Sequence, residues 1–278
     1  MLNSRTNILL NYGENLMKII TFLTDFGKKS SYVSQMKAIA LSIADTKIVD
    51  ISHEITPHDI REGAYVLQST VPYFPSGTIH IAVVDPGVGT NRKGIVITTR
   101  SQILVGPDNG LLIPTARRLG DFKIYEITNQ NLMLSNISNT FHGRDIFTPV
   151  AANILNGIEF EQIGPIVTDF IDLNFGKSEI FEKLAIGKIV YLDNFGNVIT
   201  NIDGFKIMRF IEYGKKFFLD INGKQYEIPF VKSYNFVKKD ELLATIGSSN
   251  LLEFSVNQGN ASKKLQLKPD DSIKIHYN

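Results

Sequence analysis

The chain has 278 residues, enough for one large or two ordinary domains with a buried core. Its 29 lysines and arginines and 28 aspartates and glutamates give a formal net charge of +1, so no strong field exists to attract nucleic acid or an anionic membrane. The absence of cysteine excludes disulfides, thiolate nucleophiles, cysteine-ligated zinc and iron–sulfur clusters, and it fits a cytoplasmic location.

The first 16 residues, MLNSRTNILLNYGENL, have neither the long apolar core nor the small-residue cleavage site of a signal peptide. A second methionine, Met17, leads directly into the first apolar run. We therefore expect residues 1–16 to be a flexible extension or the product of a misplaced start codon. No apolar run approaches the roughly 18 residues that a membrane helix needs, which predicts a soluble protein.

From residue 17 the first half of the sequence alternates apolar runs with amphipathic segments. The runs predict strands at 19–24, 47–51, 79–84, 94–98, 102–105 and 123–127. Helical spacing of apolar residues predicts helices at 32–43, 57–71, 112–119 and 149–155, the second of them with Thr56 as N-cap and Pro57 as its first residue. This order predicts an α/β domain with a mostly parallel sheet covered by helices.

After Gly164-Pro165 the sequence changes to short β-like runs separated by Asp-Gly, Asn-Gly and Asn-Phe-Gly turns. Amphipathic helical spacing is almost absent there. We therefore predict an α/β domain at 17–165, a linker at 166–184 and a separate all-β domain at 185–278.

The most chemically suggestive segment is VVDPGVGTNR, residues 83–92. Asp85 directly follows a predicted buried strand, and open α/β sheets place their ligand sites outside the carboxyl ends of such strands. Arg92, seven residues later, makes the two a candidate catalytic pair. A β-turn with a surface ion pair explains this motif alone equally well.

Three more residues of the first half are candidate site residues. Asp25 follows the first predicted strand, so two strands would deliver carboxylates to one edge of the sheet. Asn109 lies in an Asp-Asn-Gly segment that could equally be a tight turn. His142 precedes a helix and is the best general-base candidate of five histidines, because His80 and His276 lie inside strands. A lone histidine is nevertheless more often structural than catalytic.

Taken together, eight segments in order resemble the family of S-adenosylmethionine hydroxide adenosyltransferases, relatives of the fluorinating and chlorinating enzymes that open the same substrate. The segments are TFLTDFG (21–27), YVSQMKA (32–38), DISHEITPHDIREGAYVL (50–67), VVDPGVGTNR (83–92), VGPDNGLL (105–112), TFHGRDIFTPVAA (140–152), LDNFGNVITNI (192–202) and SSNLLEFSVNQGNA (248–261). Eight collinear matches are specific where each single motif is not.

The resemblance implies an α/β domain joined to a β-barrel-like C-terminal domain. It also implies a homotrimer in which each active site lies between the N-terminal domain of one subunit and the C-terminal domain of the next. Asp85, Arg92 and His142 would be the catalytic residues, activating water to attack ribose C5′ and release adenosine and L-methionine without a metal or cofactor. Hydrolysis is favoured over halide transfer because the halogenating relatives lack this arginine and histidine combination.

The same resemblance implies the residues that bind the adenosine part of the substrate. Asp25 would accept hydrogen bonds from both ribose hydroxyls, because two carboxylate oxygens match a vicinal diol. Phe195 would stack on adenine. Asn109 would line the adenosine region.

Residues for the methionine part would come from the second half of the chain. The resemblance implies that Asp193 and Asn197 hold the methionine ammonium and carboxylate, with Ser248 and Glu253 as weaker candidates. Without the resemblance, a hairpin turn explains residues 193–201.

Three other functions are weighed against hydrolysis. A non-catalytic module that binds S-adenosylmethionine or adenosine would keep the same binding residues. A metal-dependent hydrolase is suggested by Asp85, His142 and Asp145. A nucleotide-dependent oxidoreductase or methyltransferase is disfavoured, because no GxGxxG turn opens either early helix.

Overall fold

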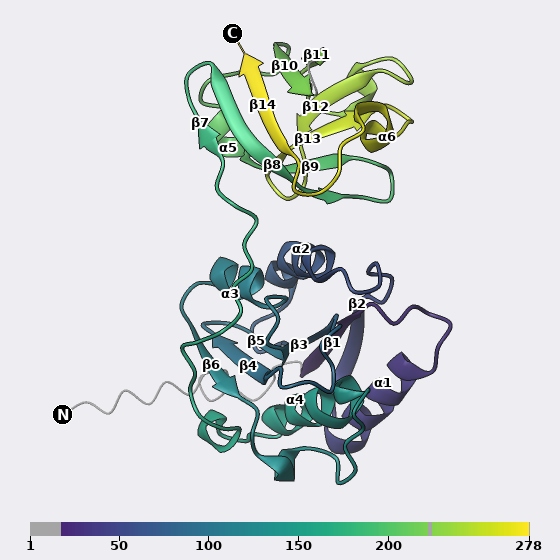
Figure 1. Ribbon diagram of the computed structural model, residues 1–278, viewed down its shortest axis with the longest axis vertical. Coiled ribbons are helices and arrows are strands. Elements are labelled where there is room, and N and C mark those ends of the chain that lie inside the picture. Colours follow the sequence, from purple (N-terminus) through teal and green to yellow (C-terminus); the bar gives the residue numbers. More distant parts are fainter. Residues whose placement is uncertain (1–17, 222–223, 278) are drawn as a thin grey trace, which may run out of the picture. The chain divides into compact units, whose positions relative to one another are not determined.

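The computed structural model describes residues 18–221 and 224–277 (Figure 1). The predicted extension at 1–16 lies outside these residues. The chain divides into two compact units between Asn174 and Phe175, and we retain 166–184 as the proposed linker. Among the described residues, no helix has both the length and the apolar character needed to cross a membrane.

The first unit is built on a six-stranded sheet with the strand order β2-β1-β3-β5-β4-β6. β1 pairs parallel with β2 and β3, and β3 pairs parallel with β5, whereas β4 runs antiparallel to both β5 and β6. The predicted α/β fold with a mostly parallel sheet is therefore confirmed, with one strand, β4, running against the others. The strands are β1 Ile19–Thr24, β2 Lys47–Ser52, β3 Ile79–Val83, β4 Gly94–Thr99, β5 Ile103–Pro107 and β6 Phe122–Glu126.

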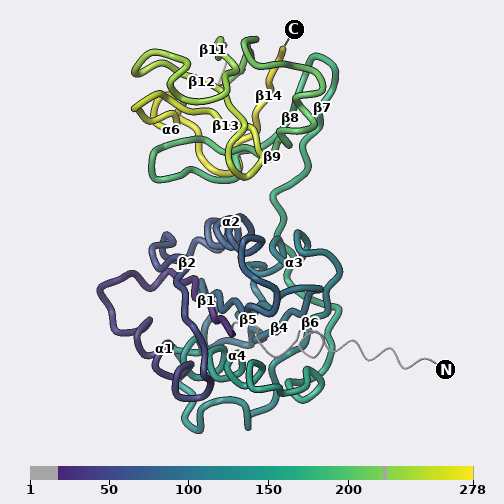
Figure 2. The backbone as a smooth tube through the Cα atoms, turned by 180° about the vertical axis from the view of Figure 1, so that it is seen from behind, coloured from purple at the N-terminus to yellow at the C-terminus, as the bar shows by residue number. Residues whose placement is uncertain are grey.

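Helices cover both faces of this sheet. Figures 1 and 2 show α1 and α4 together on one face and α2 and α3 on the other. Their apolar stripes are buried, as the helical spacing predicts; Met36 and Ala40 of α1, for example, are fully buried. The helices are α1 Tyr32–Ile43, α2 Ile60–Thr70, α3 Ile113–Leu119 and α4 Thr148–Leu155, with short 3₁₀ turns η1 Val71–Tyr73 and η2 Gln130–Leu132.

The start of α2 differs from the prediction. The helix begins at Ile60 with Asp59 as its N-cap, whose carboxylate accepts a hydrogen bond from Glu62 N at 2.9 Å. The predicted start at Pro57 was wrong because His58 has a φ of 69°, a left-handed conformation that no α-helix contains. Asp caps a helix as well as Thr does, so the local residues alone do not choose between the two starts.

The second unit is an antiparallel sheet with the order β11-β10-β14-β8-β9-β13-β12 and with β7 beside β8. Phe230, just after β11, forms a bridge with Ala244 of β12, which brings the two ends of the sheet together. The predicted barrel-like fold is thus confirmed. The elements are β7 Glu179–Ile180, β8 Leu184–Leu192, β9 Val198–Asp203, α5 Gly204–Ile207, β10 Lys216–Ile221, β11 Lys224–Pro229, β12 Leu242–Ile246, β13 Leu251–Val256, α6 Ala261–Leu265 and β14 Ser272–Tyr277.

Parallel pairing decides where the polar loops of the first unit meet. Because β1, β2, β3 and β5 run in the same direction, their carboxyl ends lie along one edge of the sheet. The loops that follow these strands carry Asp25, His53, Asp85 and Asn109. Arg92 lies at the same edge, since it precedes the antiparallel strand β4.

Candidate functional site

Asp85 and Arg92 form a nearly buried ion pair in the loop between β3 and β4. Arg92 Nε and Nη2 donate to the two carboxylate oxygens of Asp85 at 3.2 and 2.6 Å, and only 9% and 4% of the Arg92 and Asp85 side chains are exposed. The turn requires Gly89, whose φ is 78° and where a Cβ atom would lie 2.3 Å from the carbonyl oxygen of Asn139. The loop therefore holds Asp85 and Arg92 in a bidentate ion pair, which is not a flexible surface contact.

His142 joins this pair from a distant segment. Its Nδ1 lies 3.0 Å from Arg92 Nη2. Because a guanidinium group only donates hydrogen bonds, Nδ1 accepts, and the ring hydrogen of a neutral His142 lies on Nε2. His142 directly precedes a π-helical turn, η3 Gly143–Phe147, and the Arg92 guanidinium lies 5.3 Å from the centre of the Phe147 ring. π-helical turns of this kind are frequent at functional sites.

Burial changes the proton affinities of both groups that contact Arg92. Burial raises the pKa of Asp85 above its ordinary value of 3.8, although Arg92 and the Gly87 amide oppose the rise. Burial lowers the pKa of His142 below 6.5, and the positive charge of Arg92 lowers it further. At neutral pH the group therefore consists of an ionised arginine, a carboxylate more basic than usual and a neutral imidazole.

Asp25 lies at the same edge, one strand away from Asp85. It follows β1, is half-buried, and its Oδ2 accepts a hydrogen bond from His58 N at 2.9 Å. Gly27 completes the turn with a φ of 68°. One oxygen of the Asp25 carboxylate is thus held by a main-chain amide, and the other accepts no hydrogen bond from the residues that the structure describes.

Asn109 contacts the backbone that carries Asp85. Its Nδ2 donates to the carbonyl oxygen of Val84 at 2.8 Å, and its Oδ1 accepts from Leu111 N at 3.2 Å. Both ends of this side-chain amide are therefore engaged within the first unit. The geometry gives Asn109 a role in holding the Asp85 loop, whatever contact it makes with a ligand.

In the second unit, Asp193, Phe195 and Asn197 lie in one tight turn between β8 and β9. Asp193 Oδ1 accepts from the backbone N–H groups of Phe195 and Asn197, both at 2.9 Å, and its Oδ2 accepts from Asn197 Nδ2 at 2.8 Å. Gly196 has a φ of 83°. The turn leaves the Phe195 side chain 78% exposed, although burial of such a ring is strongly favourable.

Glu253 is a buried carboxylate on β13 of the same unit. Its Oε1 accepts from the hydroxyls of Tyr234 at 2.9 Å and Ser255 at 2.7 Å. Burial raises the pKa of Tyr234 to about 12, together with the negative charges of Glu253 and Asp193. Tyr234, in the 3₁₀ turn η5 Tyr234–Phe236, was not among the predicted site residues, because a tyrosine inside a polar loop carries no local signal. Ser248 is exposed in the turn after β12.

The hypothesis of a metal site formed by Asp85, His142 and Asp145 does not fit the geometry. Both Asp145 oxygens are engaged, by Arg144 at 2.6 and 3.1 Å and by Ser138 N at 2.8 Å. Both Asp85 oxygens contact Arg92. In the part of the chain that the structure describes, no group of three or more acidic or histidine side chains is arranged to hold a metal ion.

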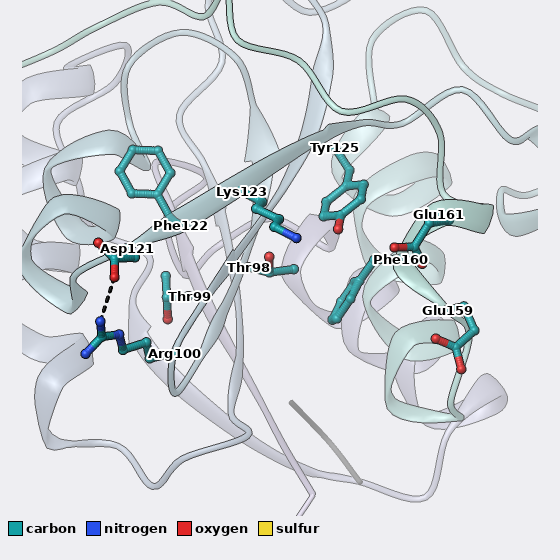
Figure 3. A pocket seen from close by; sticks show the side chains of 10 residues that line it. All are labelled: Thr98, Thr99, Arg100, Asp121, Phe122, Lys123, Tyr125, Glu159, Phe160 and Glu161. Atoms are coloured by element: carbon teal, nitrogen blue, oxygen red, sulfur yellow. Dashed lines mark hydrogen bonds and ion pairs between the residues drawn. The ribbon is translucent and has the colours of Figure 1, made fainter. Parts of the chain in front are cut away.

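Two open cavities in the first unit contain none of the predicted site residues. One of about 460 Å³ lies at the end of β4 opposite Gly94 and is closed on one side by the 3₁₀ turn η4 Phe160–Gln162. Figure 3 shows an Arg100–Asp121 ion pair at one end of it and Tyr125 beside Phe160 at the other. The second cavity, of about 580 Å³, lies between the loop after β1, the end of β2 and α1.

Both halves of the sequence match one protein family. Residues 20–164 match the SAM hydroxide adenosyltransferase N-terminal domain, and residues 187–274 match the C-terminal domain of the same family. The two matched ranges fall on the two compact units that the structure separates.

Individual relatives agree with this family. A protein named (R)-S-adenosyl-L-methionine hydrolase from Methanocaldococcus jannaschii is 39% identical over 277 residues, covering 95% of this chain and 98% of the relative. A fluorinase from Nocardia brasiliensis is 25% identical over 92% of this chain and 96% of its own. The crystal structure of an uncharacterized conserved protein from Thermotoga maritima has a TM-score of 0.87 and 38% identity, covering 92% of this chain and 99% of that one.

Proposed function

The chain belongs to the family of S-adenosyl-L-methionine hydroxide adenosyltransferases, and from this premise we propose that it hydrolyses S-adenosyl-L-methionine at ribose C5′ to adenosine and L-methionine. The observation that carries the proposal is the contact of Arg92 with both Asp85 and His142 in a nearly buried group. Their residue types and protonation suit the activation of one water molecule.

In this mechanism Asp85 is the base. Its raised pKa makes it more basic than an ordinary carboxylate, and each of its oxygens retains a lone pair beyond the one that Arg92 occupies. His142 is less suited to accept the proton, because Nδ1 is occupied by Arg92 and Nε2 carries a hydrogen. We assign to His142 the donation of a hydrogen bond that orients the water.

Hydrolysis at C5′ needs no acid or base other than Asp85. The water oxygen forms a bond to C5′ while the C5′–S bond breaks, and the electron pair of that bond leaves with the sulfur. A sulfonium becomes a neutral thioether, so the leaving group needs no proton, and the proton lost by water goes to Asp85. We therefore propose that no metal or cofactor takes part. Holding the water in line with the breaking bond supplies a large part of the rate.

Labelled water tests this reaction directly. Purified protein incubated with S-adenosylmethionine in H₂¹⁸O, with a chelator present, is expected to give ¹⁸O-adenosine and L-methionine, detected by mass spectrometry. Parallel samples with fluoride or chloride test halide transfer, which the fluorinase relative raises. A 5′-halogenated product would replace hydrolysis by halide transfer, and binding without any product would indicate a non-catalytic module.

The pH profile of kcat/KM follows from the two shifted groups, because kcat/KM reports the protonation of the free enzyme. Ionised Asp85 and neutral His142 are both required, so kcat/KM is lost as pH falls and either group gains a proton. Because the pKa of His142 is lowered from 6.5 and that of Asp85 is raised from 3.8, we expect half-loss of kcat/KM on the acid side below pH 6.5. Half-loss of kcat/KM above pH 6.5 on the acid side would contradict these assignments.

We further propose the assembly that the family implies, a homotrimer in which Asp25, Asp85, Arg92 and His142 of one subunit act with the C-terminal domain of the next. Two observations support it. The proposed catalytic residues all belong to the first unit, and the exposed Phe195 belongs to the second. An aromatic ring that stacks on adenine would gain the burial that the turn by itself does not supply.

Subunit mixing tests the shared site. Asp85→Asn and Asp193→Ala proteins are each expected to be nearly inactive, but mixed trimers would contain sites with both residues intact. Random mixing in equal amounts restores about a quarter of the sites. Mixing Asp85→Asn with His142→Ala is the matched control, because both changes fall in one domain and no intact site can form. Activity absent from both mixtures, or a monomer on sizing, would contradict the shared site.

A further inference from the structure

A second chain of polar contacts, buried at its Thr24 and His53 end, lies beside Asp25, and the reaction as proposed does not use it. Thr24 ends β1, and its hydroxyl lies 2.8 Å from His53 Nδ1. His53 Nε2 lies 3.1 Å from Asp50 Oδ1, and Lys37 Nζ donates to Asp50 Oδ2 at 2.6 Å. Thr24 is fully buried and His53 is 5% exposed. A buried polar pair such as Thr24 and His53 holds its members in one geometry.

The contacts of this chain lower the pKa of Asp50. Burial raises that pKa, but the contacts with Lys37 and His53 outweigh the burial and keep it below its ordinary value. Lys37 Nζ donates to the Asp50 carboxylate, whereas His53 Nε2 approaches Asp50 Oδ1 at 3.1 Å without hydrogen-bond geometry. Thr24 Oγ1 and His53 Nδ1 share a hydrogen bond. The Thr24 oxygen still has lone pairs, with which it accepts from Phe26 N at 3.3 Å.

The backbone amide of Gly27, two residues after Asp25, is also held by the Thr24–His53 pair. Gly27 N donates to the carbonyl oxygen of His53 at 2.7 Å. The two residues that follow Asp25 are thus held by Thr24 and His53, and the Asp25 carboxylate is held by His58 N. The orientation of the Asp25 side chain depends on how the loop after β2 is fixed against the loop after β1.

We propose that Thr24, His53 and Asp50 are positioning residues that aim Asp25 at the ribose and thereby set the selectivity for an intact 2′,3′-diol. The inference rests on the proposed function, in which Asp25 accepts hydrogen bonds from both ribose hydroxyls. Two adjacent hydroxyls are bound only when both carboxylate oxygens face them, so a small rotation of the loop loses one of the two contacts.

β1 supplies a matched control for this inference. Thr21, three residues earlier, places its hydroxyl 2.7 Å from Nδ1 of His80, and both residues are fully buried. Thr21→Val therefore removes an equivalent hydroxyl–imidazole bond from the same strand without touching a residue next to Asp25. Thr24→Val removes the hydroxyl beside Asp25 at almost constant volume, and Thr24→Ser keeps it.

The test compares these three variants with the wild type. We measure kcat and KM for S-adenosylmethionine, the melting temperature, and the dissociation constants of adenosine and 2′-deoxyadenosine. Thr24→Val is expected to raise KM about tenfold, with a change in kcat of less than about threefold, and to reduce the preference for adenosine over 2′-deoxyadenosine by about tenfold. Thr24→Ser is expected to restore most of that preference. Thr21→Val is expected to lower the melting temperature but to leave KM and the preference unchanged.

Several results would overturn the inference. They are an unchanged nucleoside preference in Thr24→Val, an equal change in Thr21→Val, and a Thr24→Ser variant that behaves like Thr24→Val. In an Asp25→Ala background Thr24→Val should change the preference no further, because the effect acts through Asp25. Failure of the wild type to hydrolyse S-adenosylmethionine would instead contradict the proposed function, and it is seen before any variant is compared.

Discussion

Asp85→Asn is expected to lower kcat for S-adenosylmethionine hydrolysis by about a hundred- to ten-thousand-fold, the range found when a general base is removed. Asparagine has nearly the same shape as aspartate and still accepts a hydrogen bond from Arg92 Nε, but it cannot take a proton from water. Single-turnover kinetics would measure the chemical step apart from product release. Binding of adenosine should persist, since Asp85 is assigned to the water and not to the nucleoside.

Asp108→Asn is the matched control for this variant. Asp108 is also a buried carboxylate at the same sheet edge, with 8% of its surface exposed, and its Oδ1 accepts from Ile171 N at 3.0 Å. An asparagine there keeps the acceptor oxygen, so kcat is expected to change by less than about threefold. A similar loss in both variants would show that a general change of charge at this edge, and not proton transfer to Asp85, lowers the activity.

Arg92→Lys is expected to lower kcat by about a hundredfold although the charge is kept. Arg92 contacts both oxygens of Asp85, the carbonyl oxygen of Lys93 and Nδ1 of His142 at once, through a planar fork of donors. A lysine ammonium is a single point of charge and cannot reproduce these four contacts together. The acid limb of the pH profile should stay near its wild-type position, because the positive charge remains.

Arg92→Met separates charge from geometry. The charge of Arg92 lowers the pKa of both Asp85 and His142, so its removal raises both and moves the acid limb to higher pH. The uncompensated Asp85 carboxylate also destabilises the folded protein by about 3–5 kcal/mol. Should this variant not fold, Arg92→Lys still tests the arrangement. Wild-type kcat in Arg92→Lys would contradict the bridging role of the guanidinium fork.

Much of the fold could be predicted because its signals are local. Apolar runs and helical spacing predicted the observed bounds of β1 and α1, and those of β3 and β5 to within two residues, since both periods are properties of consecutive residues. The start of α2 could not be chosen this way. Two possible caps lie three residues apart, and the left-handed conformation of His58, which excludes the first of them, accompanies its contact with Asp25 across the sheet edge.

The sequence by itself determined that Asp25 and Asp85 directly follow strands of an α/β sheet, because the end of an apolar run is a property of neighbouring residues. Only the tertiary structure decided that Arg92 joins Asp85 to His142, 50 residues further on, and that Asn109 holds the Val84 carbonyl. It alone revealed the Thr24–His53 pair beside Asp25. The reason is physical: hydrogen-bond direction and the desolvation that shifts a pKa depend on which distant segments pack together, and no local pattern encodes that.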